Sequence, residues 1–376
     1  MRSILDAPHI LKVTSGRVAL AMALRHAGVS SGDEVLVPAF HCESMITPIR
    51  WLGAHPVFYR IQRDLMIDMT DLDGKLSKAT RALIVTHFFG FPQDTISLRR
   101  FCDKQHVVMI EDCAHAFFGS YAGYSMGCVG DYAIASVMKF FPVFDGGCLV
   151  SRESDLTAIP LGSPGFITAA KSAVNMLERA TLYQRPGVMI SPVRGALALK
   201  NLVWRAAKRR FGRTEKMNFA PPSSEGGSWF DPAWMDIGMT LPSRWVFDHT
   251  LLTEIPTIRR RNYEMLVAGT RSLPNSRILN SELPEGAVPM VFPLHVEEAD
   301  RVASMLRKQG IAIWRFGEFI DAEARSVCPV SMDYSEHLLQ FPCHQELCIS
   351  DMAWLVGRIR SALLGGVGKN SGVTAS

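Results

Sequence analysis

Four short polar or glycine-rich groups lie at or near the ends of apolar segments of this sequence. In chain order they are Thr14-Ser15-Gly16, Glu111-Asp112, Ser136-Val137-Met138-Lys139 and Asp145-Gly146-Gly147. Each group has both a chemical and a purely structural interpretation, and none of them is decisive by itself.

The first group, Thr14-Ser15-Gly16, precedes the helical pattern RVALAMALRHAG. The backbone N–H groups and the dipole at a helix start favour a phosphate, and glycine lets that phosphate approach closely. Ordinary N-capping by Ser15 is the favoured interpretation for a single turn of this kind.

The second group, Glu111-Asp112, follows the apolar run VVMI. A carboxylate at a strand end can pair with a protonated ring nitrogen of a cofactor. Capping of the next turn explains the acid equally well. His115, three residues further on, either bonds the same ligand or satisfies a backbone group.

The third group ends in Lys139, which closes the apolar run YAIASVM. An amine presented from a buried strand end has a lowered pKa and can attack an aldehyde. A lysine whose stem merely covers apolar surface is the alternative. The following Asp145-Gly146-Gly147 allows a tight backbone turn close to a ligand.

The order of the groups is more informative than any one of them. A phosphate turn, an acid, a lysine and a Gly-Gly turn together suit pyridoxal 5'-phosphate (PLP), whose ring draws off electrons when an acid faces its nitrogen. The G-x-G-x-x-G pattern of a dinucleotide site does not follow the first strand.

The elements that must position these groups alternate between strands and helices. Strands are predicted over residues 34–40, 56–61, 82–88, 107–112 and 132–138, with helices near 17–28, 43–52 and 97–106. Such apolar strands separated by helices predict an α/β fold with a large, mostly parallel sheet covered on both faces. Ligands of such sheets bind beyond the carboxyl ends of the strands.

The last third of the chain predicts a smaller α+β domain. It contains expected strands over 288–296 and 311–316, a helix between them, and a final helix that Ser350 would cap. We therefore predict a cofactor-binding domain over 1–245 and a small domain over 246–376. The tail after residue 364 is expected to be disordered.

Residues 160–230 are rich in proline and basic side chains and fit this pattern poorly. A basic amphipathic helix is expected over 196–213, most simply as a solvated surface helix. Contact of residues 194–216 with a membrane surface or an anionic partner is the alternative.

Composition excludes several classes of protein. Of 376 residues, 48% are hydrophobic and 20% are charged, with a net charge of +4, which is an ordinary globular balance that does not call for nucleic acid. Eight cysteines without a C-x-x-C pair indicate reduced thiols, a cytoplasmic location and no structural metal. We expect no signal peptide and no transmembrane helix.

At this point the sequence resembles the DegT/StrS family of PLP-dependent sugar aminotransferases, which have the aspartate-aminotransferase fold. The resemblance runs from about residue 12 to 365, except for 160–230. It is carried by TSGRVALAMAL, GDEVLVPAF, LGAHPVFYRI, THFFGFPQD, VVMIEDCAHAFFGS, GCVGDYAIASVMK, DGGCLVS, RRRNYEML and LLQFPCHQELCISDMAWLVGRIR.

The resemblance implies roles for individual residues. It places Lys139 as the residue covalently joined to PLP, Asp112 opposite the ring nitrogen, and His115 near the ring hydroxyl; these three form the expected catalytic set. The whole implied cofactor site comprises Ser15, Gly16, Arg17, His41, Cys42, Asp112, His115, Ser136 and Lys139. Within it Ser15, Gly16, Arg17 and Ser136 would contact the phosphate. Cys42, or His41 beside it, holds the place of a ring-stacking aromatic.

The sequence also departs from the family pattern. The serine and lysine usually stand five residues apart, whereas Ser136 and Lys139 are three apart, and the loop after the lysine is shorter. Arg17 replaces a threonine. The asparagine expected to reach the partner subunit's cofactor is missing from DIGMTLPSR (236–244).

The resemblance implies transfer of an amino group from an amino acid such as glutamate to a keto sugar, most simply a nucleotide-linked one in polysaccharide or natural-product synthesis, by a homodimer. One alternative is a sugar dehydratase of the same fold, which Lys139 argues against because those enzymes replace the lysine. The other is a non-catalytic relative that serves as a binding or regulatory module.

Overall fold

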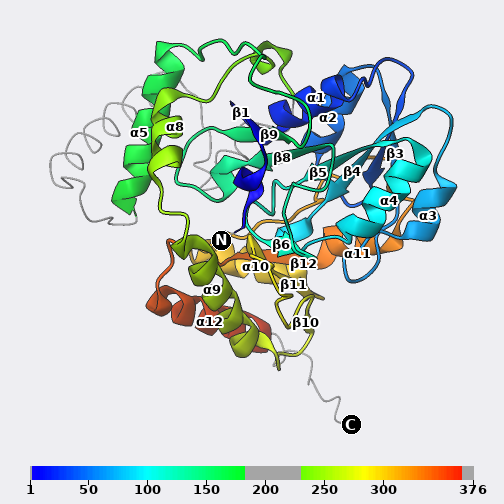
Figure 1. Ribbon diagram of the computed structural model, residues 1–376. Helices are drawn as coiled ribbons and strands as arrows, with labels where there is room; N and C mark the ends of the chain where they lie inside the picture. The colour runs from blue at the N-terminus through cyan, green and yellow to red at the C-terminus, as the bar shows by residue number, and fades with distance from the viewer. Residues whose placement is uncertain (1, 183–229, 366–376) are drawn as a thin grey trace, which may run out of the picture.

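The computed structural model describes residues 2–182 and 230–365, which form two units (Figure 1). The larger unit is built on a seven-stranded sheet and the smaller one on a three-stranded sheet. In Figure 1 the smaller unit, with helices α9 and α12, lies at the bottom of the view. The predicted α/β fold with a second, smaller α+β unit is confirmed.

The large sheet has the order β1-β9-β8-β5-β4-β2-β3. Its central strands pair in parallel, as their apolar sequences predict. These strands are β2 (Glu34–Pro38), β3 (His55–Tyr59), β4 (Thr80–Thr86), β5 (Val108–Asp112) and β8 (Tyr132–Ser136).

Two further strands complete one side of the sheet and were not predicted. β9 (Gly147–Ser151) pairs antiparallel with both β8 and β1 (His9–Val13). Because β1 is antiparallel to β9, it runs in the same direction as β8 and ends at the same edge. The turn after β1 is therefore brought to the carboxyl ends of β4, β5 and β8.

Helices and short turns connect these strands. α1 packs on β8 and β9, and α4 packs on β5. The connecting elements are η1 (Ile4–Asp6), α1 (Gly16–His26), α2 (Glu43–Trp51), α3 (Met69–Gly74), η2 (Phe88–Gly90), α4 (Thr95–Gln105), the hairpin β6 (Ser120–Tyr121) and β7 (Tyr124–Ser125), η3 (Val137–Lys139), α5 (Phe166–Leu182), η4 (Pro232–Trp234) and α8 (Leu241–His249).

The small unit begins after α8, so the connection between the units, residues 250–253, lies a few residues beyond the boundary placed at 245. Helix α9 packs on α12 and on β11 of the sheet β10-β11-β12. The elements are α9 (Glu254–Thr270), β10 (Ser276–Ile278), β11 (Val291–Val296), α10 (Ala299–Lys308), α11 (Pro329–His337), β12 (Leu338–Pro342) and α12 (Ile349–Leu364).

Two predictions in this unit are wrong. Residues 311–316 form no strand; only Trp314 pairs, as a single bridge to Gln340, and the place beside β11 is taken by β12. The final helix is capped by Cys348 instead of Ser350, since Asp351 accepts the Cys348 N–H and completes the cap.

Two other expectations concern parts of the chain outside the described residues: the basic helix over 196–213, within the 194–216 segment, and the tail. Among the described residues, no helix combines the length and the apolarity needed to span a bilayer.

The Asp145 carboxylate holds α5 and α8 against the large unit. It accepts hydrogen bonds from the Thr240 backbone N–H (2.8 Å) and from the hydroxyls of Thr240 (2.5 Å), Ser243 (2.5 Å) and Ser172 (3.2 Å). The aspartate of the predicted Asp-Gly-Gly turn is thus a buried acceptor shared by several hydrogen-bond donors. Only the two glycines of that turn lie against the turn at the start of α1.

Position 147 must be glycine because the backbone before α1 leaves no room for a side chain there. The sequence predicted a close backbone approach of this kind for the Gly-Gly turn. A Cβ placed there would lie 2.3 Å from the Ser15 carbonyl carbon and 2.6 Å from the Gly16 nitrogen. The start of β9 therefore lies directly against the start of α1.

We expect Asp145→Ala to lower the free energy of unfolding by about 3 kcal/mol, because it leaves a buried N–H and three hydroxyls without their shared acceptor. Urea titration followed by circular dichroism measures the loss. Asp73→Ala, which removes an exposed carboxylate, is the matched control and should leave the midpoint unchanged. Equal midpoints for both variants would show that the hydrogen bonds to Asp145 do not stabilise the fold.

Candidate active site

The predicted site residues converge at one edge of the large sheet. Thr86, Asp112 and Ser136 are the last residues of β4, β5 and β8, and the turn after β1 lies at the same edge. This is where an open α/β sheet binds its ligands. The convergence follows from the strand order, so it was predictable once the strands had been identified.

The turn at the start of α1 has the geometry of a phosphate site. Ser15 caps the helix by accepting the Val18 N–H (3.3 Å), so the predicted cap is confirmed. A Cβ added to Gly16 would lie 3.4 Å from both the Ala135 carbonyl oxygen and the Ser136 Cβ. The helix N-terminus and the Ser136 side chain therefore face the same small space, in which the helix dipole favours an anion.

Asp112 is buried at the end of β5. Burial raises the pKa of its carboxyl above the ordinary value, against the hydrogen bond from the Ala114 N–H (2.9 Å) and the charges of Lys139 and His87. A buried carboxyl of this kind favours a cationic hydrogen-bond donor as its partner.

The Lys139 side chain lies near Asp112. Burial lowers the pKa of its amine below the ordinary value, the charge of Arg17 adds to this effect, and Cys42 and Asp112 oppose it. The structure thus brings Arg17, Cys42, Asp112 and Lys139 together, as the sequence predicted. A lowered pKa increases the share of neutral, nucleophilic amine near neutral pH.

His115 joins this group from the loop after β5. Burial, reinforced by the Lys139 charge, lowers the pKa of His115 well below its ordinary value, so the ring is neutral. Its Nδ1 accepts the Phe89 N–H (3.5 Å), which leaves the proton on Nε2. The ring stacks on Phe89, with centroids 5.7 Å apart, and Phe316 meets it edge-on at 5.0 Å.

The expectation that His41 stands in for the ring-stacking aromatic is wrong. Its ring stacks on Phe58, Nδ1 bonds the Pro38 carbonyl (3.1 Å) and Nε2 accepts the Asp321 N–H (3.1 Å). Both nitrogens are occupied, and burial lowers the pKa of His41 to about 4. His41 therefore joins the two units, and only Cys42 lies near Lys139.

Glu111 turns away from this group and serves a structural role. It accepts hydrogen bonds from His87 Nε2 (3.0 Å) and from the N–H groups of Gly127, Val129 and Gly130. Burial raises the pKa of Glu111, but these bonds and the His87 interaction outweigh it and lower the pKa overall. The ionised carboxylate fixes the loop that leads into β8.

A buried arginine of the small unit holds the backbone that carries Lys139. The Arg259 guanidinium donates to the Lys139 carbonyl (3.2 Å), to the Met290 carbonyl (2.9 Å) and to the Gln345 side-chain oxygen (2.8 Å). Gln345 in turn donates to the Phe140 carbonyl (2.6 Å), and the guanidinium lies 4.5 Å above the Phe140 ring. Two consecutive carbonyls of the lysine turn are therefore fixed from α9 and from the loop before α12.

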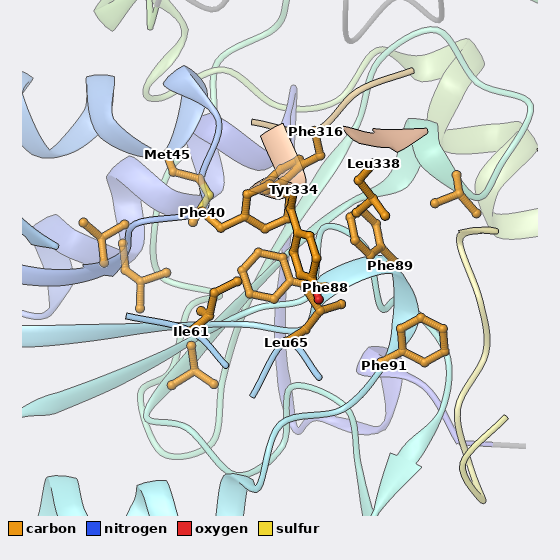
Figure 2. Close-up of a cluster of buried hydrophobic side chains, with 14 of the residues drawn as sticks. Phe40, Met45, Ile61, Leu65, Phe88, Phe89, Phe91, Phe316, Tyr334 and Leu338 are labelled. Atoms are coloured by element: carbon orange, nitrogen blue, oxygen red, sulfur yellow. The ribbon is translucent and has the colours of Figure 1, made fainter. Parts of the chain in front are cut away.

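Aromatic side chains close the seam between the two units beside this site. Figure 2 shows Phe40, Phe88, Phe89 and Tyr334 packed in one cluster. Phe316 of the small unit lies 5.0 Å from Phe40 and contacts the three phenylalanines of the large unit edge-on. The cluster excludes water from one side of the polar group.

Comparison with known proteins finds a family match over the first part of the chain. Residues 1–162 match the model of the DegT/DnrJ/EryC1/StrS aminotransferase family. The predicted resemblance is confirmed.

Curated relatives are similar to only part of this chain. The GDP-perosamine synthase of Vibrio cholerae is 35% identical over 152 residues, which are 40% of this chain and 41% of that protein. The UDP-N-acetyl-3-dehydro-alpha-D-glucosamine 3-aminotransferase of Acidithiobacillus ferrooxidans is 31% identical over 155 residues, with 39% and 41% covered. The chain thus matches about two fifths of the length of these relatives.

Solved structures match nearly the whole chain and establish the aminotransferase fold. The aminotransferase TlmJ of Streptoalloteichus hindustanus is similar with a TM-score of 0.66 and 19% identity, covering 96% of this chain and 87% of the other. The PLP form of the putative sugar aminotransferase Spr1654 of Streptococcus pneumoniae gives a TM-score of 0.67 at 17% identity, with 96% and 88% covered.

The residues at the sheet edge fit the PLP that this fold implies. The Thr86 hydroxyl is buried and lies beside Asp112 in the strand register, and among the described residues it has no hydrogen-bond partner. The same holds for the buried Thr14 hydroxyl, which precedes the turn at the start of α1. Such orphaned groups are costly unless a ligand meets them. A helix N-terminus, the buried acid Asp112 and the part-buried amine of Lys139 would meet the phosphate, the ring nitrogen and the aldehyde of that cofactor.

Several important residues were not recognised in the sequence. Arg259 and Gln345 are far from Lys139 in the chain. Their segments, RRRNY and PCHQE, resembled the family, but nothing in them singled out these two residues. His87 and Phe89 lie within THFFG, which also resembles the family, and nothing in that segment singled them out either. The unused Thr86 hydroxyl has no sequence signal at all.

We expect Arg259→Lys to lower the free energy of unfolding by about 3 kcal/mol. The ammonium of a lysine cannot make all the hydrogen bonds that the planar guanidinium donates to several oxygens at once. Urea titration measures this loss. The next-but-one arginine offers a matched control: Arg261 bonds only the Asn262 side chain among the described residues, so Arg261→Lys should be neutral. Similar losses for both variants would contradict a specific role for Arg259.

Proposed function

We propose that this protein is a PLP-dependent aminotransferase that transfers an amino group from an amino acid, glutamate in the simplest case, to a keto sugar carried on a nucleotide. The observation that carries the proposal is that a part-buried lysine lies within electrostatic reach of a buried aspartate at the carboxyl edge of an aminotransferase-fold sheet. When bound, PLP would supply an electron-accepting ring that stabilises negative charge on a substrate carbon.

Each residue of the site has a definite task in this proposal. The helix start at Gly16 and the Ser136 side chain would hold the phosphate. The Asp112 carboxylate would face the ring nitrogen, and the neutral His115 would offer its Nε2–H to the ring hydroxyl. The Lys139 Nζ would hold the aldehyde, and its lowered pKa suits it to move a proton of the substrate.

The sugar as acceptor is supported by the names of the relatives. Those relatives are a GDP-perosamine synthase, a UDP-sugar 3-aminotransferase and, in Micromonospora echinospora, a putative glutamine:amino-dideoxy-inosose aminotransferase that is 35% identical over 154 residues. Two of these names contain the word aminotransferase, and the third names a GDP-linked amino sugar. The predicted homodimer stays a prediction.

Borohydride reduction of the full chain with PLP should attach the cofactor to Lys139, as peptide mapping by mass spectrometry would show. Lys139→Ala should abolish the label, whereas Lys171→Ala, which removes an exposed lysine of α5, should keep it. The visible absorbance of the PLP-bound protein should shift when glutamate is added. A protein that takes up no PLP, or takes it up without any response to amino donors, would instead be a binding module.

We expect Asp112→Asn to lower kcat at least a hundredfold, because an amide does not stabilise the proton on the ring nitrogen. Single-turnover absorbance measurements with glutamate would give the rate. The label on Lys139 should survive, since Asp112 does not make that bond. Thr157→Ala, which changes an exposed residue, is the control variant and should keep the rate of the unaltered chain. A rate within threefold of the unaltered chain would refute the role of Asp112.

A further inference from the structure

A second group of ligand-type side chains lies on the small unit, away from the sheet edge that carries Lys139. His295 of β11 and Asp333 and His337 of α11 point at one another, with their ligand atoms all within 4.8 Å of one another. His295 Nε2 is 2.9 Å and His337 Nδ1 is 3.2 Å from the same Asp333 oxygen. Neither the family match nor the proposed chemistry makes use of these residues.

We propose that His295, Asp333 and His337 form a binding site for a divalent transition-metal ion such as Zn²⁺. Two imidazoles and one carboxylate are a ligand set that such ions prefer, whereas Mg²⁺ and Ca²⁺ favour oxygen ligands throughout. A tetrahedral zinc with bonds of about 2.1 Å keeps its ligand atoms about 3.4 Å apart. The two imidazole–carboxylate separations, 2.9 and 3.2 Å, lie close to that value. The His337 Nδ1 also bonds the Asp333 backbone carbonyl (3.0 Å), so the ion would displace the proton of that bond.

The backbone holds the three side chains in place before any ion arrives. Asp333 and His337 are four residues apart on α11 and therefore share a face of the helix. His295 stands in the middle strand of the small sheet, between β10 and β12, and its ring stacks on that of His337 with centroids 5.3 Å apart. A preformed site of this kind avoids most of the entropy cost of ordering its ligands.

One side of the cluster opens toward water and negative charge. His337 also lines a hollow of about 390 Å³, and its other walls carry four carboxylates, of Glu297, Glu298, Asp300 and Glu336, against one guanidinium, of Arg301. Such a hollow draws cations and provides room for the water that completes a three-ligand site. The triad is part-exposed, with side-chain exposures of 16% for His295 and 33% for each of the other two, so an ion can enter from solvent.

The site lies on the element that ties the small unit to the large one. Tyr334, next to Asp333, packs on Phe40, and its hydroxyl donates to the Arg63 carbonyl of the large unit. An ion that joins β11 to α11 would stabilise the helix that makes this contact. We therefore expect Zn²⁺ to raise the midpoint of thermal unfolding.

Equilibrium dialysis of the untagged full chain against ZnCl₂, followed by metal analysis, tests the proposal with and without PLP. We expect one Zn²⁺ per chain, and binding about tenfold weaker or worse in His295→Ala and in His337→Ala. Replacement of zinc by Co²⁺ should give visible absorption bands that both variants lose. Circular dichroism spectra equal to that of the unaltered chain would show that the variants are folded.

Two control variants separate this site from adventitious binding. His249→Ala removes a histidine of α8 outside the cluster, and Cys348→Ser removes the exposed thiol; both should bind zinc as the unaltered chain does. Arg63→Gln should bind more tightly, because the Arg63 charge acts on Asp333 and competes with the ion. Absence of stoichiometric zinc, binding that survives His337→Ala, or binding that disappears with Cys348→Ser would overturn the proposal. None of these outcomes depends on whether the sheet-edge site is an aminotransferase.

Discussion

The structure depends on how one buried positive charge is satisfied. The Arg259 side chain is only 1% exposed and has no carboxylate within ion-pair distance among the described residues. Burial lowers the pKa of its guanidinium to about 10, with Cys343 and Glu346 acting in the opposite direction. An isolated buried cation is very costly, so the carbonyl oxygens around it must remain where they are. Those oxygens belong to the Lys139 turn, to the segment before β11 and to Gln345, which means that one constraint fixes the lysine and joins the two units.

The same exclusion of water shifts the pKa values of the groups at the edge of the large sheet. Burial raises the pKa of Asp112 and lowers the pKa values of Lys139 and His115, so that each group is shifted toward its neutral form. A site of neutral groups is what low polarity favours in the absence of a ligand. A cationic ring nitrogen beside Asp112 would reverse the shift there, because an opposite charge close by favours the ionised carboxylate. Binding of the cofactor and ionisation of Asp112 therefore favour each other.

The sequence was sufficient for those parts of the fold that depend on local patterns. The five central parallel strands are largely apolar, and the Ser15 cap lies directly before a helical run, so both were predictable. The edge strand β1 alternates weakly, and β9 begins at two glycines, so neither carries a strong strand signal. The 311–316 segment has a strand-like composition, but β12 already occupies the only position beside β11 that β10 leaves open. Competition between segments for one position is a tertiary effect that a local pattern does not contain.

The site residues also fall into those that the sequence could predict and those that it could not. Asp112, Lys139 and Gly16 were predictable because each follows a strand or begins a helix at the same edge of the sheet. Asp145 and Glu111 have the residue types of a cofactor site, yet their carboxylates are used within the protein, by hydroxyls of α5 and α8 in one case and by a loop in the other. Residue type alone did not reveal this, since the partners lie up to 98 positions away in the chain.

The short lysine turn is the most informative departure from the family pattern. With Lys139 only three residues after Ser136, the amine leaves the sheet on a single turn of 3-10 helix instead of a longer loop. That turn is held from both sides: the Val137 N–H bonds the Gly146 carbonyl (3.0 Å), and Arg259 and Gln345 hold the carbonyls of Lys139 and Phe140. A shorter connection has fewer backbone conformations to lose, and the contacts from the small unit remove most of those that remain. The position of the Lys139 amine therefore depends on contacts from the small unit as well as on the large sheet.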